Sequence, residues 1–430
     1  MPTYSIDTRT IQPGEIYVAI RGEVHDGHRF IPQAIEKGAS GIVTEVEVDA
    51  LEGVEVIRVD NATDHLVRTA HAKLKNTGAR VVAITGSVGK TTTRAAVHAV
   101  LSEAFPVVAS EGNKNTPLGL SLLVLNREIT PETVLVLEMG ARLPGDLHEL
   151  CDAFPPTVSL VMNVKAVHVE TLGSIDGVQR EKSELVRALT EAGTAVLNAD
   201  DPRTRAMADL HDGPTLLFGR SDDARLGPSL VTADLPILGD HAILTALAAL
   251  GAGRALGMDD DAINRGLAQI TPEKGRLAKL NGRNGSTLID DTYNASPDAV
   301  CNALDVLAGL GADRRIAVLG DMLELGPTEA EQHVEVLRYA ASRADRVIAV
   351  GSLMTQAAPE VDGVEAVGAS QDLAEQIRSG VTDWPREGDA VLVKGSQGAR
   401  MERVSEAVLS PEIDPASVLA RQTPQWKAIP

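Results

Sequence analysis

Cysteine is scarce in this chain of 430 residues, which has only Cys151 and Cys301. Two cysteines cannot form a disulfide framework, and their spacing matches no metal-binding motif. Both lie among apolar residues with a helical pattern, so we expect them to be core residues.

Long hydrophobic runs and positive charge are also lacking. No apolar run is long enough to span a membrane, and the N-terminus lacks the basic and apolar segments of a secretory signal. The 60 acidic residues outnumber the 40 basic ones, which gives a formal net charge of −20. This balance argues against nucleic acid as a partner, because a phosphate backbone needs a basic face. We therefore predict a soluble, cytoplasmic protein, with monomer as the default state and no membrane partner.

The composition, with 43% hydrophobic residues, is that of a globular chain, and 430 residues suffice for two or three domains. Apolar strand patterns alternate with helical patterns, which predicts an α/β fold with doubly wound sheets. We predict a small α/β domain over residues 1–78, a central doubly wound domain like that of P-loop ATPases over 79–270, and a C-terminal Rossmann-like domain over 271–430.

The individual elements follow from the same patterns. In the first domain we expect strands at 16–20 and 41–46 and a helix at 31–37. In the central domain we expect strands at 81–85, 134–138, 158–163 and 194–198, a helix from 181 to about 192, and an apolar helix at 241–256. In the third domain we expect strands at 287–289, 316–319, 347–350 and 390–393, and a peripheral polar tail from about residue 414.

The central domain is organised around Val81 to Thr93, which reads VVAITGSVGKTTT. A buried strand runs into a glycine-rich turn, and a helical pattern follows. Such a turn is an anion site, because backbone N–H groups and the helix dipole favour negative charge there. Lys90 would reach the terminal phosphates of a nucleotide, and the Thr91 hydroxyl would ligate Mg²⁺. The full Walker spacing is absent, since Ile84 replaces its first glycine, but a plain surface turn does not explain Gly-Lys-Thr after a buried strand.

Three further side chains are candidates on this edge of the sheet. Glu138 ends a strand of Val and Leu beside the phosphate turn, which favours a Mg²⁺ ligand over a solvated strand end. His168 follows the strand that ends at Asn163, and a ligand role and a structural role are equally compatible with it. Lys182, by its pattern alone, is most simply an exposed helix lysine.

These residues together resemble the ATP-dependent Mur ligases of peptidoglycan synthesis. The resemblance lies in residues 85–92, Glu138, residues 163–168, Lys182 and residues 290–297, and covers nearly the whole chain. The strings DDTYNASPDAV, GDMLELG and VLVKGSQGARMERV favour the branch of the family that adds D-alanyl-D-alanine, and SIDTRTIQPGEIYVAIRG is similar to a uridine-nucleotide-binding domain. The family string H-N-x-x-N reads HAILT at 241–245, without either asparagine expected near adenine.

The resemblance implies a role for each matching residue. ATP would be held by Thr85, Gly86, Ser87, Val88, Gly89, Lys90, Thr91 and Thr92, and covered by Arg276, Asp291 and Asn294. One Mg²⁺ would be bound by Thr91 and Glu138 and a second by His168 and a carbamylated Lys182, with Lys90, Glu138, His168 and Lys182 as the catalytic set. The uridine diphosphate would face Asp7, Thr8, Arg9, Gly22 and His28, and the peptide would border Asn113, Asn115 and Thr116.

The implied reaction is the ATP-dependent joining of D-alanyl-D-alanine to UDP-N-acetylmuramoyl-tripeptide through an acyl phosphate, which yields ADP and phosphate. Such an enzyme would serve cell wall biogenesis, cell shape and cell division. Three alternatives remain. The chain could be a sibling ligase that adds a single amino acid, such as meso-diaminopimelate or lysine. It could also be a similar protein that binds nucleotide without turnover, or a simple NTPase switch.

Overall fold

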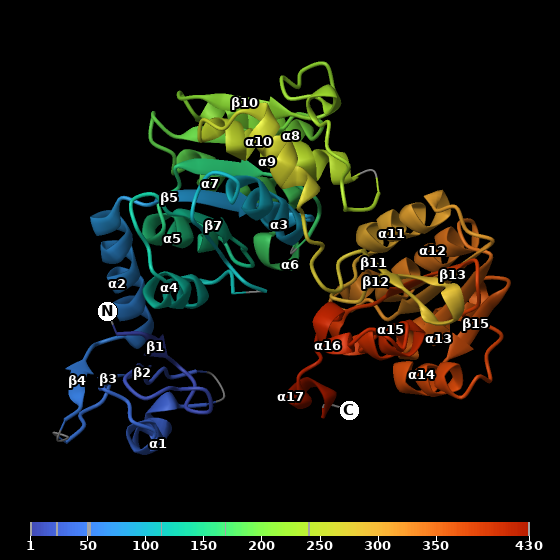
Figure 1. Cartoon of the computed structure of the whole chain (residues 1–430), viewed down its shortest axis with the longest axis horizontal. Helices are drawn as coiled ribbons and strands as arrows, with labels where there is room; N and C mark the ends of the chain where they lie inside the picture. Colours follow the sequence, from blue (N-terminus) through green and yellow to red (C-terminus); the bar gives the residue numbers. More distant parts are fainter. Residues whose placement is uncertain are drawn as a thin grey trace. The chain divides into compact units, whose positions relative to one another are not determined.

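The computed structural model describes residues 2–22, 25–49, 53–112, 114–167, 169–239 and 241–428. Its contacts divide the chain into two compact units, Met1–Ala233 with Leu244–Gln269, and Asp234–Ile243 with Ile270–Pro430. Figure 1 shows the elements coloured along the sequence. The first unit contains two parallel sheets and the second contains one mixed sheet, so the predicted α/β class is confirmed.

The N-terminal sheet of the first unit is small and entirely parallel, with the order β1-β2-β3-β4. Its strands and flanking helices are β1 (Tyr4–Ser5), β2 (Ile16–Val18), α1 (Ile31–Glu36), β3 (Gly41–Thr44), β4 (Glu55–Arg58) and α2 (Ala62–Thr77). One face packs on α1, and the other shares a core with α2. Helix α2 begins after Asn61, whose side chain accepts from the N–H of Asp64, and ends at Gly78 with a φ of +68°.

The central sheet has the order β10-β9-β8-β5-β7-β6, and all its strands are parallel. Its strands are β5 (Arg80–Thr85), β6 (Val107–Ala109), β7 (Val134–Glu138), β8 (Val158–Val161), β9 (Thr194–Asn198) and β10 (Thr215–Phe218). The helices in this part of the chain are α3 (Lys90–Leu101), α4 (Pro117–Asn126), α5 (Asp146–Ala153), α6 (Val169–Leu172), α7 (Ile175–Arg187), α8 (Pro202–Arg205), α9 (His241–Ala255) and α10 (Asp260–Ala268). β5 and β7 share one core with α2, α4 and α5.

Two predicted boundaries in this sheet are wrong. Helix α7 begins after Ser174, whose hydroxyl accepts from the N–H of Gly177, and it ends at Arg187. The prediction began this helix at Glu181, because the N-cap signal at Ser174 was not used. Strand β8 ends at Val161, so Asn163 lies in the following turn. Because α7 begins earlier than predicted, Lys182 lies in the middle of this helix. Its side chain is buried, so the exposure predicted from its pattern is wrong.

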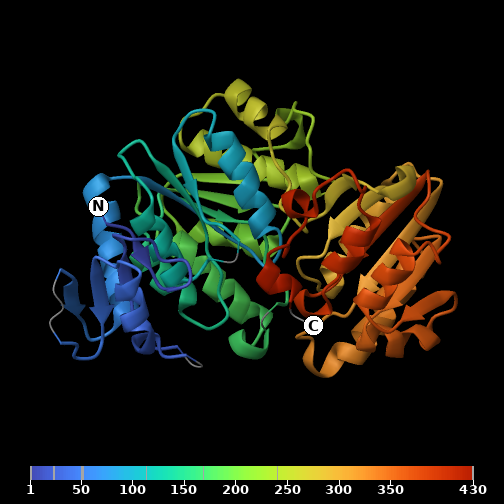
Figure 2. The same cartoon turned by 60° about the horizontal axis from the view of Figure 1, so that its bottom comes forward.

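The sheet of the second unit has the order β11-β12-β16-β13-β14-β15, with only β11 antiparallel to its neighbour. Its strands are β11 (Ala278–Asn281), β12 (Thr287–Asp291), β13 (Arg314–Gly320), β14 (Arg346–Val350), β15 (Val364–Val367) and β16 (Asp389–Lys394). The helices are α11 (Pro297–Gly309), α12 (Glu329–Ala341), α13 (Ser352–Ala357), α14 (Ser370–Arg378), α15 (Glu402–Val408), α16 (Pro415–Val418) and α17 (Pro424–Lys427). Two apolar cores, one under α11, α12 and α13 and one under α14 and α15, cover opposite faces of the sheet, as the orange and red helices in Figure 2 illustrate.

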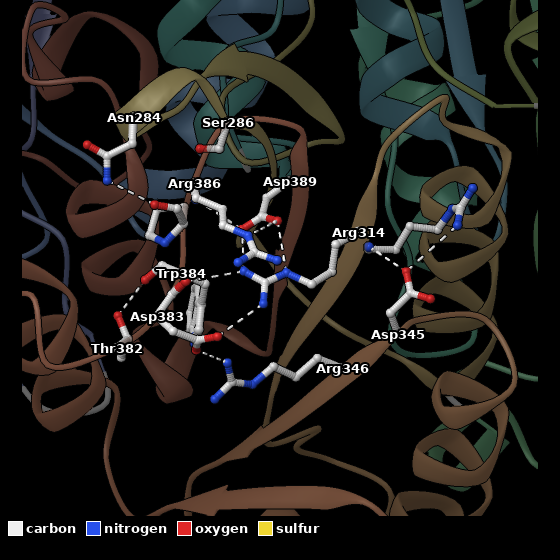
Figure 3. A network of polar contacts seen from close by, with 12 residues as sticks. Asn284, Ser286, Arg314, Asp345, Arg346, Thr382, Asp383, Trp384, Arg386 and Asp389 are labelled. Atoms are coloured by element: carbon white, nitrogen blue, oxygen red, sulfur yellow. Dashed lines mark hydrogen bonds and ion pairs between the residues drawn. The ribbon is translucent and has the colours of Figure 1, made fainter.

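A network of charges joins the amino-terminal ends of these strands (Figure 3). Arg314, the first residue of β13, donates from Nε and Nη2 to both carboxylate oxygens of Asp389, the first residue of β16, at 2.9 Å each. Asp383 bridges Arg314 to Arg346, the first residue of β14. The network therefore lies at the edge of the sheet opposite to the loops that follow the strands.

The C-terminal tail lies mostly at the surface of the second unit, as predicted, but it has an apolar anchor that the prediction did not include. Leu419 is only 1% exposed and belongs to the core under α14 and α15. The polar composition of the tail concealed this anchor. None of the helices in the described part of the chain has the length and apolar character that crossing a bilayer requires.

Candidate active site

The predicted phosphate turn lies where the strand order of the central sheet reverses. From β5 the chain passes to β6 and β7 on one side, whereas from β8 it passes to β9 and β10 on the other. In open α/β sheets such a reversal creates a crevice at the carboxyl ends of the strands, and ligands bind there. The turns after β5 and β8 therefore border the candidate site.

Two glycines allow the turn after β5. A Cβ atom on the buried Gly86 would lie 2.9 Å from the Cβ atom of Met162, so only glycine fits beside the end of β8. Gly89 has a φ of +82°, a conformation that favours glycine. Helix α3 then begins at Lys90, whose ammonium donates to the Gly86 carbonyl at 2.9 Å. The strand, turn and helix are arranged as the sequence predicts.

Asn163 fastens this turn to the segment after β8. Its Oδ1 atom accepts from the backbone N–H groups of Ser87 and Val88 at 3.1 and 3.0 Å, and its Nδ2 atom donates to the Val88 carbonyl at 3.0 Å. The Ser87 hydroxyl also accepts from the N–H of Lys165 at 2.8 Å. Because the Ser87 and Val88 amides already have acceptors, the amides best suited to an anion are those at the start of α3, where a helix has no internal acceptors.

Glu138 lies directly beside the phosphate turn. It ends β7 in register with Ile84 of β5, and only 4% of it is exposed. The Thr91 hydroxyl donates to its Oε2 atom at 3.0 Å, and the Asn115 amide lies 3.5 Å from its Oε1 atom. Its own backbone N–H donates to the Ser110 hydroxyl at 2.9 Å. The structure thus brings together Thr91, Glu138 and Asn115, which the sequence predicted separately.

The Thr91 and Glu138 pair fits a magnesium ion. Mg²⁺ takes hard oxygen ligands, usually one or two from the protein and the others from water and phosphates. A hydroxyl and a carboxylate oxygen that already lie 3.0 Å apart at the start of a helix meet this requirement.

Lys182 is a buried lysine of α7. It is 4% exposed, and burial, followed by the positive charge of Lys90, lowers the pKa of Lys182 to about 7, although the neighbouring Glu181 opposes this. The Glu181 carboxylate accepts from the N–H groups of Gly145 and Leu147, both at 2.8 Å, and thereby holds the start of α5 against α7.

The remaining predicted residues of the central domain have mixed surroundings. Thr85 is buried, and among the described residues its hydroxyl has no hydrogen-bond partner. Thr92 lies in the first turn of α3. The Thr116 side chain caps α4 by accepting from the N–H of Gly119 at 3.3 Å. His168 and Asn113 lie outside the described residues, so their predicted roles stay predictions.

The N-terminal sheet gathers its predicted substrate residues at one edge. Asp7, Thr8 and Arg9 follow β1, and the segment from Gly22 to His28 follows β2, which is parallel to β1. Arg9 pairs with Asp7 at 2.6 Å and lowers the pKa of that carboxyl. Thr8 is buried and its hydroxyl donates to Gln33 at 2.7 Å.

His28 has contacts at both of its ring nitrogens. Its Nδ1 atom lies 2.6 Å from Asp26, and its Nε2 atom accepts from the backbone N–H of Glu45 at 3.1 Å. This pattern requires the proton on Nδ1. His28 therefore shapes the loop, and the partly exposed Asp7 and the exposed Arg9 are better placed to meet a ligand.

The second unit gathers Arg276, Asp291 and Asn294 into another cluster. The Asp291 carboxylate is buried, pairs with Lys394 at 2.7 Å and accepts from the N–H of Leu277 at 3.2 Å. Lys394 also donates to the carbonyl of Asn294 at 2.9 Å. The guanidinium of Arg276 stacks on the Tyr293 ring, with its Cζ atom 4.1 Å from the ring centre. Asp291, Asn294 and Lys394 lie at or after the carboxyl ends of β12 and β16, whereas Arg276 precedes β11, which begins beside the end of β12 because these two strands are antiparallel.

Sequence reasoning missed two residues that hold these clusters. The sequence places Asn163 at a strand end and at the start of the family-like residues 163–168, and Lys394 within a longer family-like string, without indicating a partner for either. Both residues carry an amide or ammonium at or just after the end of a buried parallel strand. This position is a signal for a site residue, because the carboxyl end of such a strand adjoins the turns that follow the neighbouring strands. The partners of these side chains lie on other strands, so the sequence alone could not identify them.

Three family models match the chain in order. The model of the catalytic domain of the Mur ligase family matches residues 3–76, the Mur ligase middle domain matches 84–253, and the glutamate ligase domain of Mur ligases matches 275–397. Two curated relatives named UDP-N-acetylmuramoyl-tripeptide–D-alanyl-D-alanine ligase are 31% identical. The Bacillus subtilis relative aligns with 93% of this chain and 91% of its own length, and the Escherichia coli relative with 94% and 92%.

Solved structures give the same picture. A crystal structure of MurF from Acinetobacter baumannii superposes with a TM-score of 0.85 at 25% identity, over 94% of this chain and 93% of that chain. The MurF ligase from Thermotoga maritima in complex with ADP superposes with a TM-score of 0.83 at 29% identity, over 94% of this chain and 96% of that chain. The likeness extends over nearly the whole chain.

Proposed function

We propose a function from one premise: this chain belongs to the Mur ligase family. It is an ATP-dependent ligase that joins D-alanyl-D-alanine to UDP-N-acetylmuramoyl-tripeptide in peptidoglycan synthesis. The observation that carries this proposal is the alignment of more than nine tenths of the chain with relatives of that name, at 31% identity. The ADP complex of the Thermotoga maritima relative supports ATP as the energy source.

The phosphates of ATP are assigned to the turn after β5. The helix start and the Lys90 ammonium supply positive potential at this turn. A local source is needed because the chain as a whole has a net charge of −20 and would repel a polyphosphate. Lys90 already donates to the Gly86 carbonyl, so its ammonium lies over the turn where the phosphates are expected. We assign the phosphates to the turn and helix start over residues 85–92, with the first amides of α3 and the Lys90 ammonium as the donors, because the Ser87 and Val88 amides already donate to Asn163.

Mg²⁺ is assigned to Thr91 and Glu138, whose oxygens lie 3.0 Å apart. A bound Mg²⁺ would neutralise phosphate charge and so permit an anionic nucleophile to approach. A second ion is assigned to Lys182 with His168.

For that second site, Lys182 must change its charge, since an ammonium repels a metal. The neutral amine can react with CO₂ to form a carbamate and release one proton, which turns the side chain into an oxygen ligand. Burial supports this proposal, because the pKa of Lys182 is lowered to about 7 and the neutral amine is therefore abundant at neutral pH.

The reaction proceeds in two balanced steps. The terminal carboxylate of the peptide attacks the γ-phosphorus of ATP, the bond to the bridging oxygen breaks, and an acyl phosphate and ADP form. The amine of D-alanyl-D-alanine then attacks the acyl carbon, the carbon–oxygen bond to phosphate breaks, and the amine loses a proton. Lys90 supports the first step by balancing negative charge in a site where charges interact strongly.

The domains divide these tasks. Residues 1–78 are assigned to the uridine diphosphate, through the edge that carries Asp7 and Arg9. Residues 79–270 are assigned to ATP and the peptide, with Asn115 beside Glu138. Residues 271–430 are assigned to the incoming dipeptide and, through Arg276, Asp291 and Asn294, to the nucleotide. A cytoplasmic monomer with roles in cell shape and cell division completes the proposal.

An ADP-release assay tests this function. ADP formation should require both UDP-N-acetylmuramoyl-tripeptide and D-alanyl-D-alanine, and single amino acids should not replace the dipeptide. Lys90→Ala should abolish turnover with an unchanged circular dichroism spectrum, whereas Lys75→Ala, on the exposed side of α2, should keep it. Turnover with meso-diaminopimelate or lysine indicates a sibling ligase. Hydrolysis without an amine indicates an NTPase, and nucleotide binding without any turnover indicates a binding protein.

A further inference from the structure

Arg421, in the C-terminal tail, is held against the loop that follows β12. Its Nη1 atom donates to the Thr292 carbonyl at 2.9 Å, and its Nη2 atom donates to the Tyr293 carbonyl. The Cζ atom of Arg421 also lies 5.1 Å from the centre of the Tyr293 ring, within the range of a cation–π contact. One planar guanidinium thus fixes two consecutive peptide groups and one side chain.

The same loop is tied to the segment that carries Arg276. The backbone N–H of Tyr293 donates to the carbonyl of Gly275 at 3.1 Å, and the Arg276 guanidinium stacks on the Tyr293 ring. The two segments are so close that a Cβ atom on Gly275 would lie 3.0 Å from the Tyr293 nitrogen. What fixes Tyr293 therefore also fixes Arg276.

Arg421 is itself held in place from several sides. Only 6% of its side chain is exposed, and its Nη1 atom lies 3.7 Å from the buried Glu402 carboxylate at the start of α15. Glu402 also accepts from Arg400, at 2.6 Å. Arg421 has a φ of +56°, which is unusual for a residue other than glycine and occurs where surrounding contacts impose it. Leu419 anchors the tail two residues earlier.

We propose that Arg421 is a positioning residue of the nucleotide site. It holds the carbonyls of Thr292 and Tyr293, which lie between Asp291 and Asn294 in the chain. Through the Tyr293 ring it also positions Arg276. This inference rests on the proposed function, which assigns those three residues to ATP. The C-terminal tail is then a working part of the enzyme. Arg421 acts through the loop and does not contact the substrate itself.

The test compares Arg421→Ala and Arg421→Lys with Lys427→Ala in the full-length protein. Lys427 lies in the same tail, is 49% exposed and pairs with Glu406 at 3.4 Å, so its variant removes an equal charge without touching the loop. Three quantities are measured: hydrogen exchange of peptides that cover residues 290–296, the dissociation constant of Mg·ADP by calorimetry, and KM for ATP with kcat in the ligation assay.

Arg421→Ala should speed hydrogen exchange in residues 290–296. It should raise the dissociation constant of Mg·ADP and the KM for ATP by about tenfold each, the loss expected from two charge-assisted hydrogen bonds. The change in kcat should be smaller. Arg421→Lys should give intermediate values, because an ammonium cannot bridge two carbonyls with a planar fork. Lys427→Ala should match the wild type in all three.

Unchanged exchange or unchanged ADP affinity in Arg421→Ala overturns the inference. A general loss of folding is recognised by faster exchange throughout the second unit, and Arg421→Lys then decides: wild-type ADP affinity in that variant also overturns the inference. If the wild type binds Mg·ADP but forms no ligation product, the proposed function is wrong. The inference about Arg421 is then still tested by the ADP affinity of Arg421→Ala. A wild type that binds no ADP overturns both.

Discussion

The hydroxyl of Thr91 donates a 3.0 Å hydrogen bond to the carboxylate of Glu138, although 47 positions separate the two residues. The register of β5 and β7, which pairs Ile84 with Glu138, creates this contact. The turn assigned to ATP and an acidic strand end thereby meet at the proposed Mg²⁺ site.

Glu138→Gln should weaken Mg²⁺ binding, because it removes the negative charge and keeps the size of the side chain. The Mg²⁺ concentration for half-maximal ligation should rise by at least ~10-fold. The measurement is the rate of ADP formation against total Mg²⁺. Glu149→Gln, on the exposed side of α5, is the matched control and should leave the titration unchanged. An identical Mg²⁺ dependence in Glu138→Gln contradicts the metal assignment.

Lys182 should carry a carbamate. Its pKa is lowered to about 7, chiefly by burial and then by the charge of Lys90, so its reactive neutral form predominates above that pH and declines below it. With ¹³C-labelled bicarbonate at pH 8, the wild type should show a carbamate signal by ¹³C NMR that Lys182→Arg lacks and Lys75→Arg keeps.

Removal of CO₂ at pH 6.5 should lower ligation, and added bicarbonate should restore it. Lys182→Arg should reduce ligation by ~100-fold or more, because the guanidinium stays positively charged and cannot supply the carbamate oxygens proposed as metal ligands. Full activity of the wild type in CO₂-free buffer, once the ¹³C carbamate signal has disappeared, argues against a functional carbamate.

Asp290 should make the second unit less stable as the pH rises. Burial raises the pKa of Asp290 to about 6 from an ordinary 3.8, so the folded state holds a proton that the unfolded state loses between these values. The stabilisation from that proton is complete below 3.8 and is lost as the pH rises through 6, with a slope of roughly 1.4 kcal/mol per pH unit.

Asp290→Asn should remove this slope and should be more stable than the wild type at pH 7 by on the order of 1–3 kcal/mol. Urea unfolding followed by tryptophan fluorescence reports this unit, because Trp384 and Trp426 are the only tryptophans of the chain. Asp298→Asn, on the exposed side of α11, should retain the slope. Equal slopes in the wild type and Asp290→Asn would show that the buried carboxyl is not protonated in this range.

The charge network of Figure 3 should contribute unequally to stability. The Asp389 side chain is 1% exposed, so Asp389→Ala leaves the Arg314 charge in a largely buried position and should cost about 3 kcal/mol. Glu365→Ala removes a half-exposed carboxylate from Arg346 and should cost less than ~1 kcal/mol. Tryptophan fluorescence in urea measures both, and similar losses would contradict a buried role for Asp389.

Local patterns predicted much of the fold and part of the site. The strand, turn and helix from Arg80 to Leu101 are continuous in sequence, and the glycines required by the turn lie within it. Lys182 shows the limit of this reasoning. Val178 and Val186, four residues before and after Lys182, place it on the apolar face of α7, but a helix that begins at Glu181 leaves Val178 out of the pattern, so the exposure of Lys182 is predicted wrongly.

The sequence by itself determined the α/β architecture, the phosphate turn, the acidic strand end and the family. These depend on hydrophobic periodicity and on short motifs, in which neighbours along the chain already carry the physical constraint. Only the tertiary structure decided that Asn163 fastens the phosphate turn, that Lys394 holds Asp291, and that Arg421 reaches back to Tyr293. Each of these contacts joins segments far apart in the chain, so strand register and core packing determine it.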